Sequence, residues 1–337
     1  MKIEGANKFS SRKVLLVLSI LLILLAFFGF YIKYNNNYYK ITMLGGSNMK
    51  DKGDLNSMAF ILQTANNKII VVDGGREIDA DILTEYINRL GNGKVDYWFL
   101  THAHNDHIGA IVKILEDDNY NIVIDNLCYN FNTKDWYTSY DPTRSDIAVR
   151  FLDYIESDKS SSKINNINIC QENDIIDIDN LRCKILRVAN PEIKESPSVG
   201  NEASMVFKFM MKKNNNTFSD KTIIFLGDSY LEASKEILNN HYDELNSYAV
   251  QMAHHGQNGV SKEVYDAIDP KICFYNCPKW LYDNDNGNGY NSGSFQSLTV
   301  QSWIEDEKRE TKSVVFKAYE GDVTLKITDK GYQVINR

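Results

Sequence analysis

Thr101-His102-Ala103-His104-Asn105-Asp106-His107-Ile108-Gly109 is the most informative stretch of this 337-residue chain, because it holds three of the six histidines. Histidine is the commonest metal ligand, and imidazole combined with carboxylate is a ligand set that zinc prefers. A cap at the start of the following helix would explain Asp106 alone. No structural need explains three imidazoles in six residues. The stretch therefore predicts a metal site.

The flanking sequence predicts that this site has two metal positions. Residues 97–100 read as an apolar strand and residues 108–115 as an apolar helix. His102 and His104 are two residues apart and would point the same way from an extended chain. Asp106 and His107 begin the helix and would point from a second direction.

Later strand ends supply further candidate ligands. A predicted buried strand ends in Asp73-Gly74-Gly75, the strand at residues 222–226 runs into Gly227-Asp228-Ser229, and residues 248–252 lead into Ala253-His254-His255-Gly256. Each segment alone is typical of a turn or a surface pair. His254 is the preferred ligand of its pair because it comes first after the strand. His255 would then support a ligand or face the substrate, and His241 is expected at the surface.

With these residues in this order, residues 38–337 resemble the metallo-β-lactamase-fold hydrolases. The HxHxDH signature of that family is matched by His102, His104, Asp106 and His107. The resemblance implies an αββα sandwich, two divalent metal ions and hydrolytic activity.

One ligand of the usual family pattern is missing. Most members have another histidine ahead of the aspartate that bridges the metals, but no histidine occurs between His107 and Asp228. Gly200-Asn201-Glu202-Ala203-Ser204 stands at that place. An Asn in this setting is similar to the metallo-β-lactamase-like domain of the DNA-internalisation competence proteins and to choline-phosphate esterases that act on teichoic acids. It is unlike the true β-lactamases.

The resemblance also implies a role for each ligand. One ion would be held by His102, His104 and Asp228, with Asn201 or Glu202 as a possible addition, and the other by Asp106, His107, His254 and the shared Asp228. A water between the two ions would attack the substrate, with Asp106 and Asp228 as catalytic residues. Asp106 could alternatively orient that water. The ions are expected to be Zn²⁺, with Mn²⁺ as an alternative because oxygen ligands favour harder ions.

The N-terminus predicts a membrane anchor. Residues 14–32 are 19 residues without a charge, which is long enough to cross a bilayer, and residues 1–13 carry four positive charges against one negative. By the positive-inside rule residues 1–13 would be cytoplasmic and everything after Lys33 extracellular. A cleaved signal peptide is the alternative, although no small-residue cleavage site follows before Gly45.

After a linker at residues 33–40, residues 41–337 are expected to form one layered α/β domain. Strands are predicted at 59–64, 69–73, 122–125, 181–187, 205–210, 222–226, 272–275, 314–317 and 323–327, and helices at 78–90, 146–157, 231–239 and 298–307. Residues 130–141 are interpreted as a mobile surface loop, and the Gly-rich residues 284–294 as a loop that edges the substrate cleft. The five cysteines are scattered and expected to be mostly buried thiols.

Charge weighs against nucleic acid as a partner. The whole chain has a net charge of −8, and without its first thirteen residues about −11, whereas nucleic-acid-binding surfaces are positive. The leading hypothesis is a membrane-anchored hydrolase of phosphodiester-type bonds, in cell-envelope polymers or in extracellular DNA. The alternatives are an amide or thioester hydrolase on the same metals, or a binding module that has kept the fold without catalysis.

Overall fold

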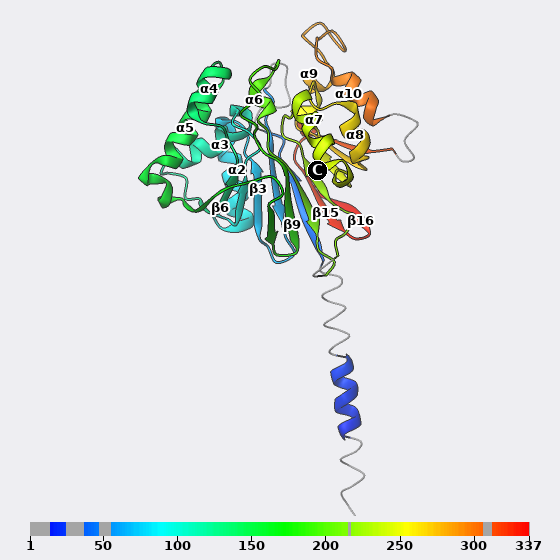
Figure 1. Cartoon of the computed structure of the whole chain (residues 1–337). Helices are drawn as coiled ribbons and strands as arrows, with labels where there is room; N and C mark the ends of the chain where they lie inside the picture. Colours follow the sequence, from blue (N-terminus) through cyan, green and yellow to red (C-terminus); the bar gives the residue numbers. More distant parts are fainter. Residues whose placement is uncertain (1–13, 25–36, 47–54, 215–216, 306–311, 337) are drawn as a thin grey trace, which may run out of the picture.

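The structure is a computed structural model that describes residues 14–24, 37–46, 55–214, 217–305 and 312–336 (Figure 1). Residues 14–24 are helical. Within the described ranges, no helix combines the length and the apolar character that crossing a membrane requires. Residues 25–32 of the predicted anchor lie outside the described residues, as do residues 1–13 and the first half of the predicted linker, residues 33–36.

Two β-sheets form the centre of the domain. The first sheet has the order β16-β15-β1-β2-β3-β5-β6-β4, with β7 also paired to β6. Its strands are β1 (Tyr38–Met43), β2 (Ala59–Gln63), β3 (Ile69–Asp73), β4 (Lys94–Val95), β5 (Tyr97–Phe99), β6 (Val123–Tyr129), β7 (Ile164–Ile169), β15 (Val323–Thr328) and β16 (Gly331–Asn336).

The second sheet has the order β14-β13-β12-β11-β10-β9-β8. Its strands are β8 (Ile175–Ile178), β9 (Leu181–Arg187), β10 (Val206–Met211), β11 (Ile223–Phe225), β12 (Ala249–Gln251), β13 (Ile272–Tyr275) and β14 (Val314–Lys317). In both sheets the strands nearest the metal-ligand candidates run parallel: β3 with β5, and β11 with β12 and β13. Parallel strands bring their carboxyl ends to one edge, which is where loops carry functional residues.

Phenylalanines fill the space between the two sheets. Phe60 of the first sheet packs edge-on against Phe225 and Phe274 of the second, with ring centroids 5.1 and 5.5 Å apart. Every residue of β2, β3, β11 and β12 is buried. Strands buried on both faces need apolar residues without alternation, which explains runs such as Ile70-Val71-Val72.

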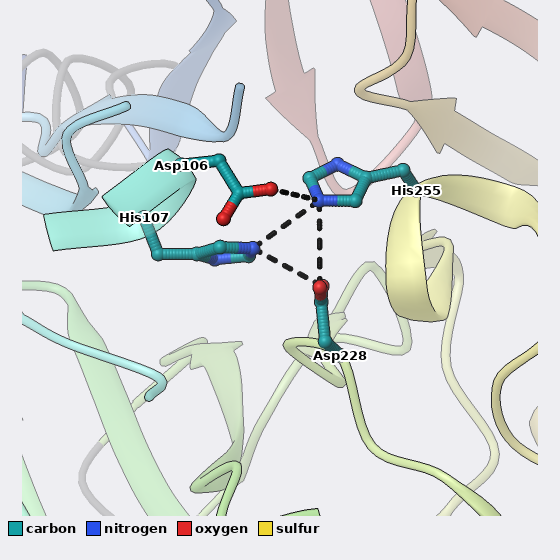
Figure 2. Close-up of side chains that lie close together, drawn as sticks. All are labelled: Asp106, His107, Asp228 and His255. Atoms are coloured by element: carbon teal, nitrogen blue, oxygen red, sulfur yellow. Dashed lines mark hydrogen bonds and ion pairs between the residues drawn. The ribbon is translucent and has the colours of Figure 1, made fainter. Parts of the chain in front are cut away.

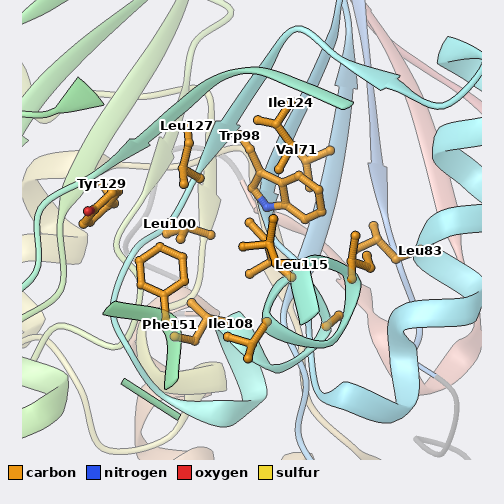
Figure 3. Packing of buried hydrophobic residues seen from close by; sticks show 14 of the residues in the cluster. Val71, Leu83, Trp98, Leu100, Ile108, Leu115, Ile124, Leu127, Tyr129 and Phe151 are labelled. Atoms are coloured by element: carbon orange, nitrogen blue, oxygen red, sulfur yellow. The ribbon is translucent and has the colours of Figure 1, made fainter. Parts of the chain in front are cut away.

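Helices cover the outer face of each sheet, as Figure 1 shows. On the first sheet, Leu83 of α2 (Ala80–Gly91), Ile111 of α3 (Asn105–Glu116) and Phe151 of α5 (Ser145–Glu156) join Trp98 in one buried cluster (Figure 3). On the second, α7 (Leu231–His241), α8 (Lys262–Ile268) and α10 (Ser297–Ile304) cover another. The predicted αββα sandwich is therefore confirmed.

Some sequence-based expectations were wrong in detail. Residues 130–141 are not simply a surface loop, because they contain α4 (Lys134–Tyr140). The Thr133 side chain accepts a hydrogen bond from the Trp136 backbone N–H and so caps this helix, and Trp136 and Tyr137 are buried. The strands β1, β7, β8 and β16 were not predicted. The short helices α6 (Val199–Glu202) and α9 (Lys279–Tyr282) were not predicted either.

His241 is also not a surface residue, since its exposed fraction is 4%. It lies between the carboxylates of Glu172 and Glu244, at 2.8 and 3.0 Å, which satisfies both ring nitrogens in a buried position. The five cysteines are buried, as predicted.

Candidate metal centre

The candidate ligands lie at the carboxyl ends of strands from both sheets. Asp106 and His107 begin α3 after β5, Asp228 follows β11, and His255 lies in the short turn η4 (Ala253–Gly256) after β12. One ligand atom from each of these four side chains lies within 4.8 Å of all the others. Figure 2 shows the four side chains pointing toward a common centre. Two imidazoles and two carboxylates at this spacing form a donor set that fits a divalent ion.

The distances within this four-residue group are short. His107 Nε2 lies 3.2 Å from Asp228 Oδ1 and 3.3 Å from His255 Nε2. His255 Nε2 lies 3.2 Å from Asp106 Oδ2 and 3.4 Å from Asp228 Oδ2. His107, Asp228 and His255 are almost fully buried, so the group is held by packing rather than by solvent-exposed loops.

Asp73, at the end of β3, holds the histidine-rich stretch in place. Its buried carboxylate accepts hydrogen bonds of 2.7 Å from the Thr101 backbone N–H, the Thr101 hydroxyl and His107 Nδ1. The last bond fixes the His107 ring with Nε2 toward the centre, the usual arrangement around a metal-binding histidine. From the sequence, Asp73 was interpreted only as the start of a turn.

Gly75 completes this turn. The N–H groups of Gly74 and Gly75 both donate to the His107 carbonyl, at 2.8 and 3.2 Å. Gly75 has a φ of 84°, and a Cβ there would come within 2.3 Å of the Ser57 hydroxyl. Only glycine fits both the backbone conformation and the space.

Of the adjacent histidines, the structure brings His255 into the group rather than the preferred His254. His255 Nδ1 donates to the Asn276 carbonyl at 2.8 Å, which leaves Nε2 free to face Asp106 and Asp228. His254 Nε2 lies 4.0 Å from Asp228 Oδ2 and accepts a 3.0 Å hydrogen bond from the Asn201 amide. Both residues have left-handed backbones, with φ of 48° and 59°, so the order along the chain does not decide which side chain faces the centre.

We therefore expect His255→Ala to be more damaging than His254→Ala. Loss of the His255 imidazole removes one of four donors and should lower metal affinity at least about a hundredfold, whereas loss of His254 should cost about tenfold or less. Competition with a chromogenic chelator measures both affinities. The reverse order would restore His254 as the ligand.

His102 and His104 lie beside the four-residue group but are not part of it. His102 is buried, its Nε2 makes no hydrogen bond within the described chain, and that atom lies 3.8 Å from Asp228 Oδ2. A buried ring nitrogen without a partner is costly unless a cation or water satisfies it. The ring centroids of His102 and His104 are 4.6 Å apart. These two residues can hold a second ion together with Asp228.

The two residues considered as substitutes for the missing histidine have other contacts. Glu202 accepts hydrogen bonds from the backbone N–H groups of Glu232 and Ala233, at 3.0 and 2.8 Å, and so neutralises the start of α7. It does not lie in the metal group. Asn201 is buried and contacts His254, and its side-chain oxygen makes no hydrogen bond within the described residues. That oxygen is still able to act as a donor to a metal.

The pKa values of the side chains in this group depend on the contacts between its histidines and its carboxylates. Burial acts to lower the pKa of both His107 and His255, but Asp228 and the other carboxylates outweigh it. The pKa of His107 is raised well above its ordinary value, and that of His255 to about 9. Burial acts to raise the pKa of Asp228, and the two histidines hold that pKa well below its ordinary value. Without metal, two imidazolium and two carboxylate charges balance at neutral pH.

Metal binding should therefore release protons. A dication that binds His107 and His255 must displace the protons that both rings carry at pH 7, so apparent affinity should rise as the pH increases from 7 through the pKa of His255, which is about 9. We expect about two protons released per ion in this group. Calorimetric titration at pH 7 in buffers of different ionisation enthalpy counts them, and release of none would contradict the charge balance.

The metal group adjoins a cleft of about 680 Å³, which is lined by its two carboxylates, Asp106 and Asp228. Arginines line one part of it, and Trp280, Leu281 and Phe295 line another. Further lining residues include His104, Asp106, Asn201, Asp228 and His254. Residues on either side of the Gly-rich loop 284–294 line the cleft, but none of the loop residues does, so the prediction that this loop edges the cleft is not confirmed.

Comparison with known proteins agrees with this geometry. Residues 53–160 match the model of the Metallo-beta-lactamase superfamily. The matched segment contains His102, His104, Asp106 and His107, the four residues of the HxHxDH motif. No curated protein matches the sequence.

Comparison with solved structures finds similarity at low sequence identity. Unliganded yeast PDE1 is 14% identical with a TM-score of 0.51, over 86% of this chain and 99% of that one. The metallo-β-lactamase fold protein YhfI from Bacillus subtilis is 11% identical with a TM-score of 0.49, over 86% and 99%. A diphosphatase of the PhnP family is 12% identical with a TM-score of 0.43, over 86% and 97%.

Proposed function

We propose that this metallo-β-lactamase superfamily domain is a metal-dependent hydrolase of phosphodiester bonds. The observation that carries the proposal is the combination of a four-residue metal group and three arginines, Arg76, Arg144 and Arg150, around one cleft. Two divalent ions in such a centre supply an activated water and stabilise the negative charge of a phosphoryl transition state.

The arginines differ in how available they are to a substrate. Arg150 is paired with Glu77 and Glu116. Arg76 donates to the Asn56 carbonyl at 2.7 Å and lies 3.7 Å from Asp106 Oδ2. Arg144 is exposed, and among the described residues its guanidinium makes no recorded ion pair. Guanidinium groups recognise phosphate oxygens with charge-assisted hydrogen bonds, so Arg144 is the residue best placed to meet an incoming phosphoester.

The remaining roles belong to side chains of the metal group. Asp106 Oδ2 accepts a 2.8 Å hydrogen bond from the Asn56 amide and faces His255. A carboxylate so oriented can hold a proton of the attacking water, while Asp228 contacts both histidines of the group. A relation to the DNA-internalisation competence proteins would make DNA the substrate, and Zn²⁺ or Mn²⁺ would serve as the ion.

A substrate panel tests this function. Bis(p-nitrophenyl) phosphate, p-nitrophenyl phosphorylcholine, thymidine 5′-(p-nitrophenyl phosphate) and single-stranded DNA represent the phosphodiesters, and a thioester and a β-lactam represent other bonds. We expect phosphodiester hydrolysis that a chelator abolishes and Zn²⁺ or Mn²⁺ restores. Turnover of the thioester or β-lactam alone would replace the proposal with the second hydrolase hypothesis, and no turnover with full metal occupancy would favour the binding module.

We further propose that residues 14–32 anchor the protein in the membrane with the domain outside the cell. The uncharged run and the positive residues ahead of it support this placement. Protease added to intact cells should then remove the domain and leave the N-terminal segment in the membrane. Recovery of a soluble form that begins beyond Ile32 would indicate a cleaved signal peptide instead.

A further inference from the structure

We infer that Trp280 and Phe295, the aromatic pair of the cleft, form a subsite for a neutral planar ring, and that this ring is the nucleobase of a nucleoside phosphodiester. The inference rests on the proposed phosphodiester hydrolysis and names its substrate class. Trp280 belongs to α9 and Phe295 precedes α10, and both side chains line the cleft beside the metal group. Their ring centroids lie 5.8 Å apart with an interplanar angle of 52°.

The cleft has two walls of different chemistry. Its three arginines follow β3 or belong to the start and the middle of α5, which covers the first sheet. The aromatic pair belongs to segments that accompany the second sheet, and Figure 1 shows α9 and α10 on the opposite side of the molecule from α5. Between the walls, Asp106 follows a strand of the first sheet and Asp228 a strand of the second. A phosphodiester held at these carboxylates through metal can direct one substituent toward each wall.

A buried asparagine holds Phe295 beside Trp280. The exposed fraction of Asn284 is 4%, its Oδ1 accepts a 3.0 Å hydrogen bond from the Phe295 backbone N–H, and its side-chain amide donates to the Gly293 carbonyl at 3.1 Å. The Asn284 carbonyl accepts in turn from the Gly293 N–H at 2.6 Å. The Gly-rich loop is thus closed at its base, and this closure brings its two flanks, and with them the aromatic pair, together.

Further contacts tie the aromatic pair to the metal-binding end of the second sheet. The Gln296 N–H donates to Asn258 Oδ1 at 2.8 Å, and the Asn258 carbonyl accepts from His254 Nδ1. Leu281, next to Trp280, is 1% exposed and packs in the core under α7, α8 and α10. A surface fixed in this way requires little ordering when a ligand binds.

The chemistry around the aromatic pair favours a neutral ring over a cation. Aromatic faces bind either planar rings by stacking or quaternary ammonium groups by cation–π attraction. Apart from the metal-group aspartates, the carboxylates in the described cleft lining are Glu77 and Asp146, and both belong to the arginine wall. The lining contributed by the second-sheet side includes the uncharged amides of Asn201 and Gln257. Such amides supply donors and acceptors for the heteroatoms of a base.

Binding of four phosphate monoesters, the product side of the reaction, tests the inference without turnover. Thymidine 5′-monophosphate and adenosine 5′-monophosphate carry a base, phosphocholine carries a cation, and methyl phosphate carries neither. Titration of the Zn²⁺-loaded full chain, followed by ligand-detected NMR, gives each affinity and the shifts of the base protons. We expect both nucleotides to bind at least about tenfold more tightly than methyl phosphate, with upfield shifts of their base protons. Phosphocholine should bind no more tightly than methyl phosphate.

Variants of the aromatic pair locate the effect. Trp280→Ala and Phe295→Ala should each reduce the preference for nucleotides to within about threefold of methyl phosphate and leave the affinity for methyl phosphate unchanged. Tyr290→Ala is the matched control, because Tyr290 is 72% exposed on the Gly-rich loop and does not line the cleft. If Trp280→Ala does not fold, Phe295→Ala alone decides, since the Phe295 side chain is 39% exposed.

Equal affinity for all four ligands, tightest binding of phosphocholine, or a nucleotide preference that survives in Phe295→Ala would each overturn the inference. Nucleotide binding that depends on the aromatic pair, without hydrolysis of any phosphodiester, would refute the proposed function and leave the subsite in place. Hydrolysis of bis(p-nitrophenyl) phosphate without a preference for nucleotides would refute the subsite and leave the proposed function in place.

Discussion

Asp228→Ala is expected to lose metal and hydrolytic activity together. Asp228 contacts His107 and His255 and also lies 3.8 Å from Nε2 of His102, so its carboxylate reaches both metal positions. Removal of the Asp228 carboxylate therefore leaves each metal position with one ligand fewer. A loss of about 4 kcal/mol of transition-state stabilisation corresponds to about a thousandfold in rate, and we expect at least that. Elemental analysis after dialysis and phosphodiester hydrolysis measure the two effects.

The matched control is Asp220→Ala, an exposed aspartate a few residues earlier in the chain, which should leave both quantities unchanged. Asp106→Asn provides a graded comparison. It removes a donor from one position only, so one ion should remain while most of the rate is lost. Wild-type metal content in Asp228→Ala would show that the bridging assignment is wrong.

Asp73→Asn is expected to have the largest effect on stability of any single change around the centre. The Asp73 carboxylate accepts hydrogen bonds from three donors, two of Thr101 and one of His107. An asparagine side chain has one oxygen fewer, and its NH₂ group would face one of these donors. Leaving buried donors unsatisfied costs about 1–3 kcal/mol each, so the free energy of unfolding should fall by about 2–4 kcal/mol. Metal affinity should also fall about tenfold to a hundredfold.

Urea unfolding in the presence of a chelator measures the change in the free energy of unfolding alone, because metal then makes no contribution to stability. Asp118→Asn, an exposed aspartate that follows α3, should change the free energy of unfolding by less than about 0.5 kcal/mol. A stable Asp73→Asn protein with unchanged metal affinity would mean that the His107 ring is held by its packing alone.

The sequence predicted most of the fold and the local part of the centre. His102, His104, Asp106 and His107 are contiguous, so their motif and the surrounding strand-to-helix pattern are visible without tertiary information. Strands such as 69–73 and 272–275 were placed correctly because continuous apolar runs are typical of strands buried on both faces. The edge strands β7 and β16 are largely exposed and lack that signal.

What the sequence could not predict depends on backbone direction and on long-range contacts. The choice between His254 and His255 turns on two left-handed residues, which no rule based on chain order anticipates. Glu202 could not be excluded as a ligand until its hydrogen bonds to α7 were visible. The 2.7 Å contact between His104 and Asp141 joins residues 37 positions apart, and Asp141 belongs to a segment that the sequence predicted to be a mobile loop.

The ligands follow strands of both sheets, so they are far apart in the chain and are made at different times on the ribosome. His107 and His255 are 148 residues apart in the chain, so at about 5–20 residues per second the first is made roughly 7–30 seconds before the second. During that interval Asp106 and His107 are without His255, so the four-residue metal group is incomplete. This group can bind a metal only after His255 has been made and the strands of the second sheet have packed against the first.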